Sequence, residues 1–416
     1  MSVLDLLVIT LLATEPAAQL ARADSAYFAG QDEAARRAYR EVLARDPRSV
    51  RANHRLGLLL SRVGRLDSAL VLIARARELE PRDPGLLLDE ARLLGWAGRL
   101  NASIADYHTL LSLDPDDSDA RQGLERAQHA QRPRVELDYS VSEDSDHNVN
   151  GSRTVTTSFA IADGVRGLLS GGSLAASDPA RDASRTFGEA GLEAARGRAQ
   201  LTLAGGTRWL DPAGAASRSL STYRASMNVR ASRQLSVGAG FAHSPLDETA
   251  ALIGSGLEVD ELNASIDAEP GARLSLSAGG GAAWLSDGNR RTSVLIAVMH
   301  PLARLGSFGV LGRVLAYERS GVGYFSPDRF ALAEARTVLA HSRGAWTGRL
   351  NASVGSQQVG AEAATQLAWR VTGDVQCAWA PLHRIVASVG ASNSAASSTT
   401  GAYRYLTAAL GLRLGL

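Results

Sequence analysis

From about Pro133 onward, apolar and polar positions alternate along the chain. The last segment, LTAALGLRLGL, has leucine at 406, 410, 412, 414 and 416, with Ala408 in the gap and Arg413 among the intervening residues. Successive side chains of a β-strand point to opposite faces, so this segment predicts a strand with one apolar face. The same period recurs in RVELDYSVS, GRAQLTLAGGTRW, RQLSVGAGFA, ARLSLSAGGGAAW, GRLNASVGS and LAWRVTGDVQCAW.

The connections between these segments alternate in length. Short links such as AARGR, ASRQ and APLH take turns with longer ones such as HSPLDETAALIGSG, SGVGYFSPD and SNSAASSTTG. An antiparallel array with short turns at one end and long loops at the other is typical of an outer-membrane β-barrel. We count about 14 strands, or about 16 if Ser152 to Ala176 adds a hairpin, within the even-numbered range of such barrels.

A soluble β-sandwich or propeller is the alternative, because alternation alone fits either class. We favour the barrel because the polar face carries Arg, Gln, Asn, Ser or Gly on almost every strand, and closure leaves no unpaired edge in lipid. The last strand is then expected to pair with the first, with its leucines toward lipid and Arg413 toward the lumen. The candidates for the membrane interface are the tryptophans near strand ends: Trp209, Trp284, Trp369 and Trp379.

The front of the chain repeats with a period of 34 residues. Glycine stands at 30, 64 and 98, and proline at 47, 81 and 115. Equivalent positions keep their character: Ala35, Ala69 and Ser103 are small, and Tyr39, Ile73 and Tyr107 are large. Glycine permits a tight reversal between helices, and proline ends a helix without removing an interior hydrogen bond.

These blocks resemble the tetratricopeptide repeat (TPR), a unit of two antiparallel helices. Three units are the usual minimum for a stable stack, and DDSDARQGLERAQHAQR is expected to form a polar capping helix. The resemblance implies a concave binding face, although several of its residues could equally pack between helices. The groove candidates are Tyr27, Phe28, His54, Arg62, Arg92 and Trp96.

Composition narrows the class further. The 416 residues suffice for two domains, and the net charge of +1 gives no field that favours nucleic acid. The single cysteine, Cys377, excludes an internal disulfide and a cysteine-based zinc site. Residues 1–18 contain a short apolar core that predicts a secretory signal peptide, with a buried first helix as the alternative. The predicted fold is therefore α+β with two domains: a TPR-like α-solenoid (19–132) and an antiparallel transmembrane β-barrel of about 14–16 strands (133–416).

Helical repeats followed by a barrel resemble the outer-membrane export subunits of exopolysaccharide systems, namely the cellulose synthase outer-membrane subunit and the poly-N-acetylglucosamine porin. Within GVGYFSPDRF, the residues Tyr324, Phe325, Ser326 and Pro327 are similar to a segment in the barrel of the cellulose export subunit. Those exporters carry many more helical repeats, and the smaller YaiO-type outer-membrane barrels match the length better. The resemblance implies a location in the outer membrane, with the N-terminal domain in the periplasm.

The lumen of such a barrel would contact the glycan through polar side chains on the inward faces. The candidates are Glu136, Asp138, Arg198, Arg208, Asn228, Arg230, Arg349, Asn351, Arg370 and Asp374. Two functions stay open: an export conduit whose repeats bind a periplasmic or inner-membrane protein, and a non-conducting anchor that presents the repeats as a scaffold. We find no catalytic motif and expect neither an enzyme nor a cofactor.

One acidic segment has the spacing of a calcium loop. Asp144, Asp146, Asn148 and Asn150 alternate in SEDSDHNVNG, but the glycine and the terminal glutamate of an EF-hand are misplaced. A solvated acidic loop is the simpler interpretation, and we expect no metal site.

Overall fold

The computed structural model describes residues 17–271, 273–302, 305–395, 401 and 403–416. The chain divides into a helical unit that ends at Gln131 and a β unit that begins at Arg132. Residues 1–16, which hold most of the predicted signal peptide, lie outside the described residues. Among the described helices, none combines the length and the apolar character needed to cross a membrane.

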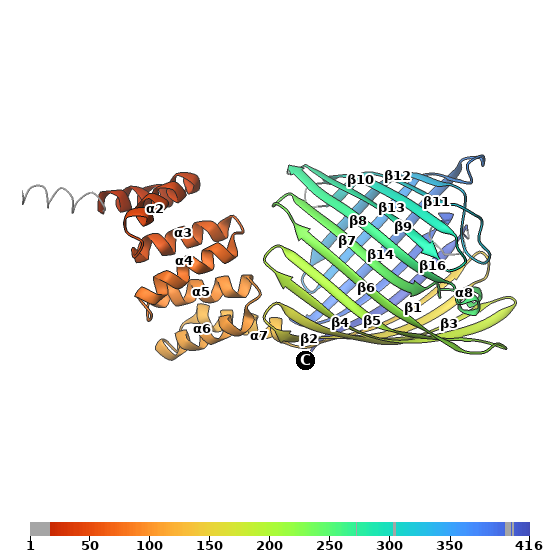
Figure 1. The fold of residues 1–416 in the computed structure, drawn as a ribbon, viewed down its shortest axis with the longest axis horizontal. Helices are drawn as coiled ribbons and strands as arrows, with labels where there is room; N and C mark the ends of the chain where they lie inside the picture. The colour runs from red at the N-terminus through yellow and green to blue at the C-terminus, as the bar shows by residue number, and fades with distance from the viewer. Residues whose placement is uncertain (1–16, 272, 303–304, 396–400, 402) are drawn as a thin grey trace, which may run out of the picture. The chain divides into compact units, whose positions relative to one another are not determined.

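The helical unit is a stack of antiparallel helix pairs (Figure 1). A helix at residues 17–28 pairs with the helix that follows it, and the two later repeats are built in the same way. The last helix follows the third repeat, as the predicted capping helix does. The remaining helices are α2 (Asp32–Arg45), α3 (Val50–Arg62), α4 (Leu66–Leu79), α5 (Pro84–Trp96), α6 (Leu100–Leu113) and α7 (Ser118–Gln131).

The 34-residue period corresponds to one helix pair, which confirms the TPR-like repeat. Gly30, Gly64 and Gly98 have φ angles of 71°, 75° and 76° in the turns within the pairs. This left-handed conformation strains any residue with a Cβ atom, so the periodic glycines set the turns. The predicted small positions, Ala35, Ala69 and Ser103, are all fully buried between helices.

An ion triad joins the second and third repeats. Arg77 on α4 pairs through Nε with Glu90 on α5 at 2.9 Å and through Nη1 with Asp106 on α6 at 2.6 Å. Both carboxylates are buried, and burial raises the pKa of each, while attraction to Arg77 opposes the rise only in part. The triad therefore holds two desolvated acids by means of one cation.

The β unit is a closed antiparallel barrel of sixteen strands (Figure 1). The larger of the two expected strand counts is confirmed, because the region Ser152–Ala176 does form a hairpin, from β2 and β3. The strands are β1 (Arg134–Asp144), β2 (Val149–Ala162), β3 (Val165–Asp178), β4 (Arg181–Arg196), β5 (Ala199–Pro212), β6 (Arg218–Arg230), β7 (Leu235–Pro245), β8 (Glu258–Gly271), β9 (Leu274–Leu285), β10 (Arg290–Leu302), β11 (Gly306–Tyr317), β12 (Phe330–Arg343), β13 (Trp346–Val359), β14 (Gln366–Ala380), β15 (His383–Ser392) and β16 (Tyr405–Gly415).

The first and last strands close the barrel. β1 pairs with β16 over its whole length, from Arg134 opposite Gly415 to Asp144 opposite Tyr405. The final residue also donates its backbone N–H to the Pro133 carbonyl at 2.9 Å. The predicted pairing of the chain end with the first strand is thereby confirmed, and it satisfies backbone groups that lipid could not.

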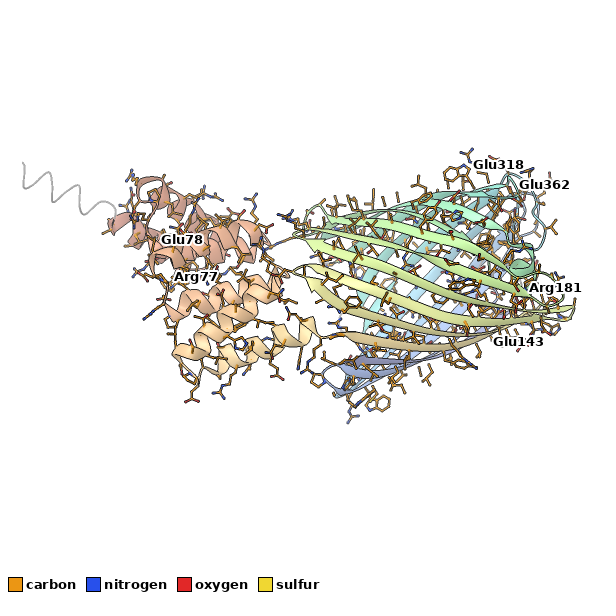
Figure 2. All side chains as sticks on the ribbon, turned by 60° about the horizontal axis from the view of Figure 1, so that its bottom comes forward. Arg77, Glu78, Glu143, Arg181, Glu318 and Glu362 are labelled. Carbon is orange, nitrogen blue, oxygen red and sulfur yellow. The ribbon has the colours of Figure 1, made fainter. Side chains whose placement is uncertain are left out.

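The two ends of the barrel differ, as the connection lengths predicted. At one end, which we call the short-turn end, strands follow one another after two to four residues. At the other, the long-loop end, three connections span 246–257, 318–329 and 393–404, and the first contains a short helix, α8 (Ala250–Ser255). Charged residues mark the long-loop end, among them Glu143, Arg181, Glu318 and Glu362 (Figure 2).

The outer face of the barrel is apolar. On β16, Leu406 and Leu410 are 55% and 50% exposed, and on β1 Leu137, Tyr139 and Val141 are exposed in the same way. Of the four tryptophans predicted at the interface, Trp209, Trp284 and Trp379 are exposed on the outer face. Trp369 lies on the same face, opposite the exposed Val354, but is half-buried. Exposed apolar side chains on every second residue of a closed barrel are the surface that a bilayer requires.

The ion triad of the helical unit gives a stability prediction. Replacing Arg77 by methionine (Arg77→Met) leaves Glu90 and Asp106 buried without a counter-charge, so we expect the helical unit to lose about 3 kcal/mol of stability near neutral pH. The helix signal of the full-length protein in detergent, followed by circular dichroism during denaturation, measures this loss. Arg75→Met, on the exposed side of the same helix, is the matched control and should change little.

The pH dependence tests the cause of the loss. The pKa values of Glu90 and Asp106 are raised in the folded protein, so protonation favours the folded state, and this contribution disappears as the pH rises through those values. The deficit of Arg77→Met should therefore shrink as the pH is lowered through them. A deficit that stays constant with pH would contradict the electrostatic explanation.

Candidate functional site

The polar side chains of the barrel face its lumen. Glu136 and Asp138 on β1 lie on the face opposite the exposed Leu137 and Tyr139, and both pair with Arg413 on β16, at 3.1 Å and 2.8 Å. The inward position expected for Arg413 is thus confirmed. Arg349 and Asp374 stand directly opposite each other on β13 and β14, and Arg370 shares the inward face with Asp374.

Two of the lumen candidates occupy strand ends. Arg198 lies in the turn between β4 and β5 and donates a hydrogen bond to the Ala231 carbonyl at 3.0 Å. Arg230 is the last residue of β6, at the short-turn end. Arg208, by contrast, points into the lumen from β5, next to the fully buried Leu210. The remaining candidates, Asn228 on β6 and Asn351 on β13, also lie on inward faces.

Toward the long-loop end the lumen becomes apolar, which the sequence did not predict. Two clusters of buried apolar side chains line the inner wall there. One lies on β3, β4 and β5 and contains Leu174, Ala176, Ala183 and Leu210; the other extends from β8 to β14 and includes Val259, Leu285, Leu315, Phe330, Leu332 and Ala368. The lumen therefore has a polar part at the short-turn end and a part with two apolar clusters at the long-loop end.

The connection 246–257, which we call the plug segment, joins the two clusters. Its helix α8 places Ala250 and Ile253 in the cluster on β3–β5 and Leu252 in the cluster on β8–β14. All three side chains are at most 1% exposed. The plug segment therefore lies inside the barrel, packed mainly on β3–β5 and joined through Leu252 to the second apolar cluster.

Ionic contacts hold the plug segment to the wall. Asp247 is buried and lies 3.1 Å from Arg185 Nε on β4 and 3.4 Å from Arg208 Nε on β5. On β6, Arg218 donates to the carbonyls of Ser255 and Gly254 at the end of α8. The base of the segment is narrow, because Leu246 N–H donates to the Leu257 carbonyl at 2.8 Å.

The segment Tyr324 to Pro327, which resembles the exporter motif, forms part of the same closure. The Tyr324 hydroxyl donates to Asp287 Oδ2 and accepts from Asn289 Nδ2, both at 2.8 Å, and burial raises the pKa of this phenol to about 12. Ser326 Oγ accepts from Gly321 N–H at 2.7 Å, and Phe325 packs edge-on against Phe330 with ring centroids 5.7 Å apart. The motif holds the 318–329 loop against the apolar cluster of β8–β14.

A third connection also bends inward. Ala395 is 1% exposed and donates its N–H to Gln357 Oε1 at 3.0 Å, while Gln357 Nε2 donates to the Asn393 carbonyl. Between α8 and the Tyr324 loop lies a polar pocket of about 490 Å³ that includes Asp287, Asn289 and Arg319. Residues from all three long connections thus meet at the mouth.

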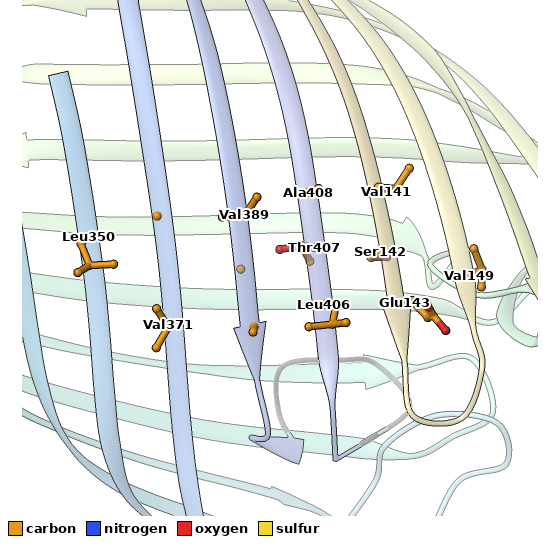
Figure 3. Close-up of a pocket in the computed structure, with 13 residues that line it drawn as sticks. Val141, Ser142, Glu143, Val149, Leu350, Val371, Val389, Leu406, Thr407 and Ala408 are labelled. Carbon is orange, nitrogen blue, oxygen red and sulfur yellow. The ribbon is translucent and has the colours of Figure 1, made fainter. Parts of the chain in front are cut away.

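The outer wall carries a hollow of another kind. A depression of about 590 Å³ crosses β13–β16 and β1, and Figure 3 shows Leu350, Val371, Val389 and Leu406 along it. These side chains belong to the outward, apolar face. The hollow therefore suits acyl chains of the membrane and not a sugar.

In the acidic turn between β1 and β2, the Asp144 carboxylate accepts hydrogen bonds from other residues of the same turn. Asp144 accepts hydrogen bonds from Asp146 N–H at 2.9 Å and from the backbone and side chain of Asn148. Among the described residues, no group of three or more His, Cys, Asp or Glu side chains is arranged to bind a metal ion.

The helical candidates separate into two sets. Tyr27, Phe28 and Arg62 come together with Arg55, whose guanidinium lies 4.6 Å from the Tyr27 ring centroid and 5.2 Å from that of Phe28. Phe28 and Trp96 are 73% and 67% exposed and occupy the same position of the repeat as Arg62. The second set links neighbouring helices of the stack. His54 Nε2 lies 2.7 Å from Asp89 of the next repeat, and Arg92 pairs at 2.7 Å with Asp119 on the capping helix α7.

Sequence reasoning missed the plug segment and the residues that hold it. The apolar run AALIG within a long polar connection was the available signal, because a loop in water has no need of it. Arg185 and Arg218 carried no signal, since inward arginines occur on many strands.

No family model matches the sequence, and no match is found among curated proteins. Among solved structures, the chain is similar to a bacterial polysaccharide outer membrane secretin, with TM-score 0.56, 13% identity, and coverage of 69% of this chain and 99% of that one. CdiB from Acinetobacter baumannii gives TM-score 0.46 and 11% identity over 69% and 60% of the two chains. The second TPR domain of human RPAP3, in complex with an HSP70 peptide, gives TM-score 0.25 and 18% identity over 26% and 92%. The first likeness, which covers 69% of this chain, shows a shared fold for that part alone. The chain as a whole is a transmembrane β-barrel preceded by TPR-like helical repeats.

Proposed function

We propose that the protein is an outer-membrane conduit for a polysaccharide. The structure would then represent a closed state, with the plug segment in the mouth of the barrel. The observation that carries the proposal is the division of the lumen. Polar side chains line the short-turn end, and the plug segment and the Tyr324 loop occupy the long-loop end through noncovalent contacts that could be broken. Hydroxyl, amide and charged groups along the wall can bind sugar hydroxyls weakly and repeatedly, which permits sliding.

The fold supports the proposal without specifying the cargo. The secretin to which this chain is similar is described as a polysaccharide protein, and the architecture of repeats before a barrel resembles exopolysaccharide exporters. The apolar outer face requires a membrane, and a closed barrel of this type belongs in an outer membrane. The proposal assigns no catalytic step to the chain.

The proposed orientation places the helical repeats and the short turns in the periplasm and the long loops outside the cell. An even strand number puts both ends of the barrel chain at the short-turn end, where β1 begins and β16 ends. Residues 1–18 would direct export and be removed, and the mature chain would consist of the repeats (19–132) and the barrel (133–416).

The helical repeats would bind a periplasmic or inner-membrane protein. The exposed rings of Phe28 and Trp96, together with Tyr27 and Arg55, form a surface of aromatic and cationic groups, which is typical of binding sites. His54 and Arg92 are engaged between repeats and would act by holding the stack in shape.

A second function is favoured by the plug segment itself. A barrel that stays closed would be an anchor, and its repeats would serve as a scaffold for periplasmic proteins. The two functions differ in whether the mouth opens, so they can be separated by conductance.

The first prediction concerns removal of the plug segment. Because Leu246 and Leu257 are hydrogen-bonded neighbours, Asp247–Gly256 can be replaced by an Asn-Gly turn without straining β7 and β8. We expect the full-length protein to be nearly silent in planar bilayers and the shortened variant to conduct. Oligosaccharides added at the short-turn end should block that current.

A shortened variant that stays silent while retaining its barrel spectrum would reject the conduit and favour the anchor. Replacement of the β13–β14 connection by a turn of the same length is the matched control. That connection carries the exposed Glu362 and takes no part in the plug segment.

The second prediction concerns the ionic attachment. Asp247→Asn keeps the shape of the side chain but leaves Arg185 and Arg208 without their shared carboxylate. Breaking such a buried pair costs about 3 kcal/mol, which corresponds to a roughly hundredfold larger open population. Single-channel recording of open events measures this effect. Asp178→Asn, which alters a pair with the exposed Arg181 at the same rim but outside the plug segment, should leave the open population unchanged.

The third prediction concerns location. In a Cys377→Ser background, the chain has no cysteine, so one can be introduced at Ala215 in the β5–β6 loop, at Ala345 in the β12–β13 turn or at Glu78 in α4. A membrane-impermeant maleimide should label the Ala215→Cys protein on intact cells. The other two should react only after the outer membrane is permeabilised, and the reverse pattern would overturn the proposed orientation.

A further inference from the structure

An inward arginine stands beneath the plug segment in apolar surroundings. Arg313 lies on β11 and faces the lumen, opposite Leu295 on β10 and Leu332 on β12. Leu311 and Leu315, two residues away on the same strand, share its face and are 9% and 4% exposed. The base of this side chain is therefore enclosed by four leucines.

Among the described residues, Arg313 forms no hydrogen bond or ion pair. The neighbouring acids are engaged elsewhere: Glu261 accepts from Arg291 at 2.7 Å, and Glu334 accepts from the Ser353 hydroxyl at 2.8 Å. The positive charges of Arg291 and Arg370 act on Arg313 from the same part of the lumen. Three arginines therefore lie in this part of the lumen, and Glu261, whose charge also acts on Arg313, is itself paired with Arg291.

An unpaired cation in such a place has a free-energy cost. Guanidinium groups remain charged, and their burial against apolar side chains is costly unless a counter-charge lies near. Arg208 and Arg413 also face inward, but each of them has a carboxylate within ion-pair distance. A charged group retained without a partner at membrane depth marks a functional site.

We propose that Arg313, with Arg291 and Arg370 beside it, binds a carboxylate of an acidic polysaccharide on its way through the barrel. A guanidinium fork matches a carboxylate through two parallel hydrogen bonds. The inference rests on the proposed conduit and narrows its cargo to a glycan that carries uronic acids. A neutral glucan would leave the cation uncompensated.

The site can be reached from the polar end of the lumen. Ser307, Gly309 and Leu311 are the inward residues of β11 between Arg313 and the short-turn end, and the first two are small, which leaves room along that part of the wall. Arg336 and Arg349 face inward from β12 and β13 toward the same end. An acidic chain would therefore meet several cations before it reaches Arg313.

Binding of defined oligosaccharides to the full-length protein in detergent tests the proposal. Isothermal calorimetry would compare oligogalacturonate with a cello-oligosaccharide of equal length. We expect the acidic oligomer to bind, with an affinity that falls as salt is added, and the neutral one to bind at least tenfold more weakly. Arg313→Gln should reduce the acidic affinity about tenfold or more.

Arg224→Gln is the matched control. Arg224 also faces the lumen, but Glu189 neutralises it at 2.7 Å, so its loss should leave the affinity unchanged. A second readout excludes misfolding: because Arg313 has no partner, Arg313→Gln should unfold at the same temperature as the native protein or a higher one. A lower unfolding temperature would reveal a structural role and overturn the proposal.

The remaining outcomes are also decisive. Equal affinity for the neutral and acidic oligomers, or an equal loss in both variants, would reject the Arg313 site and leave the conduit standing. Acidic binding that depends on Arg313, in a protein that stays silent after removal of the plug segment, would uphold the site and reject the conduit. If a sulfated oligosaccharide competed for the site and oligogalacturonate did not, the group bound by Arg313 would be a sulfate ester and the proposed carboxylate would be rejected.

Discussion

The pairing of β1 with β16 is the constraint on which the rest of the barrel depends. A sheet in lipid has no water to satisfy its edge, so every backbone donor must find a strand partner. Arg134 to Asp144 meet Gly415 to Tyr405 without a break, and this register fixes which face of every other strand is inward. Arg413 then meets Glu136 and Asp138 within the lumen, while Leu406 and Leu410 meet lipid.

Closure creates an interior, and the chain fills it unevenly. Near the short-turn end the inward residues are polar, and such a wall is compatible with a water-filled lumen. Near the long-loop end the inward leucines need cover, and the plug segment, the Tyr324 loop and Ala395 provide it. The same apolar residues that would be unfavourable in a water-filled channel are therefore satisfied only while the mouth is closed, which couples the state of the mouth to the hydration of the lumen.

Much of this architecture is readable from spacing, because spacing reports local geometry. Glycine at 30, 64 and 98 gave the helical repeat, and alternation around Arg413 gave the faces of the last strand. What fills the lumen was not readable. The two-residue alternation places Leu315 and Leu332 on the inward face of their strands. It does not show that α8, from another part of the chain, packs in the same apolar cluster. The lack of a partner for Arg313 could not be predicted either. Its surroundings come from three strands, and a nearby acid, Glu261, is paired with another arginine.

The attachments of the plug segment bear on whether it moves. Asp247 and the end of α8 are held by side chains of β4, β5 and β6, while Leu246 and Leu257 form a narrow base at β7 and β8. A buried ion pair adds little net stability, since desolvation offsets most of the attraction, yet it imposes a specific position. The contacts thus fix the position of the plug segment in the closed state but lower the free energy of that state only a little relative to the open one. If the barrel carries an acidic glycan as proposed, that glycan would compete with Asp247 for the guanidinium groups of Arg185 and Arg208, and this competition would favour release of the plug segment.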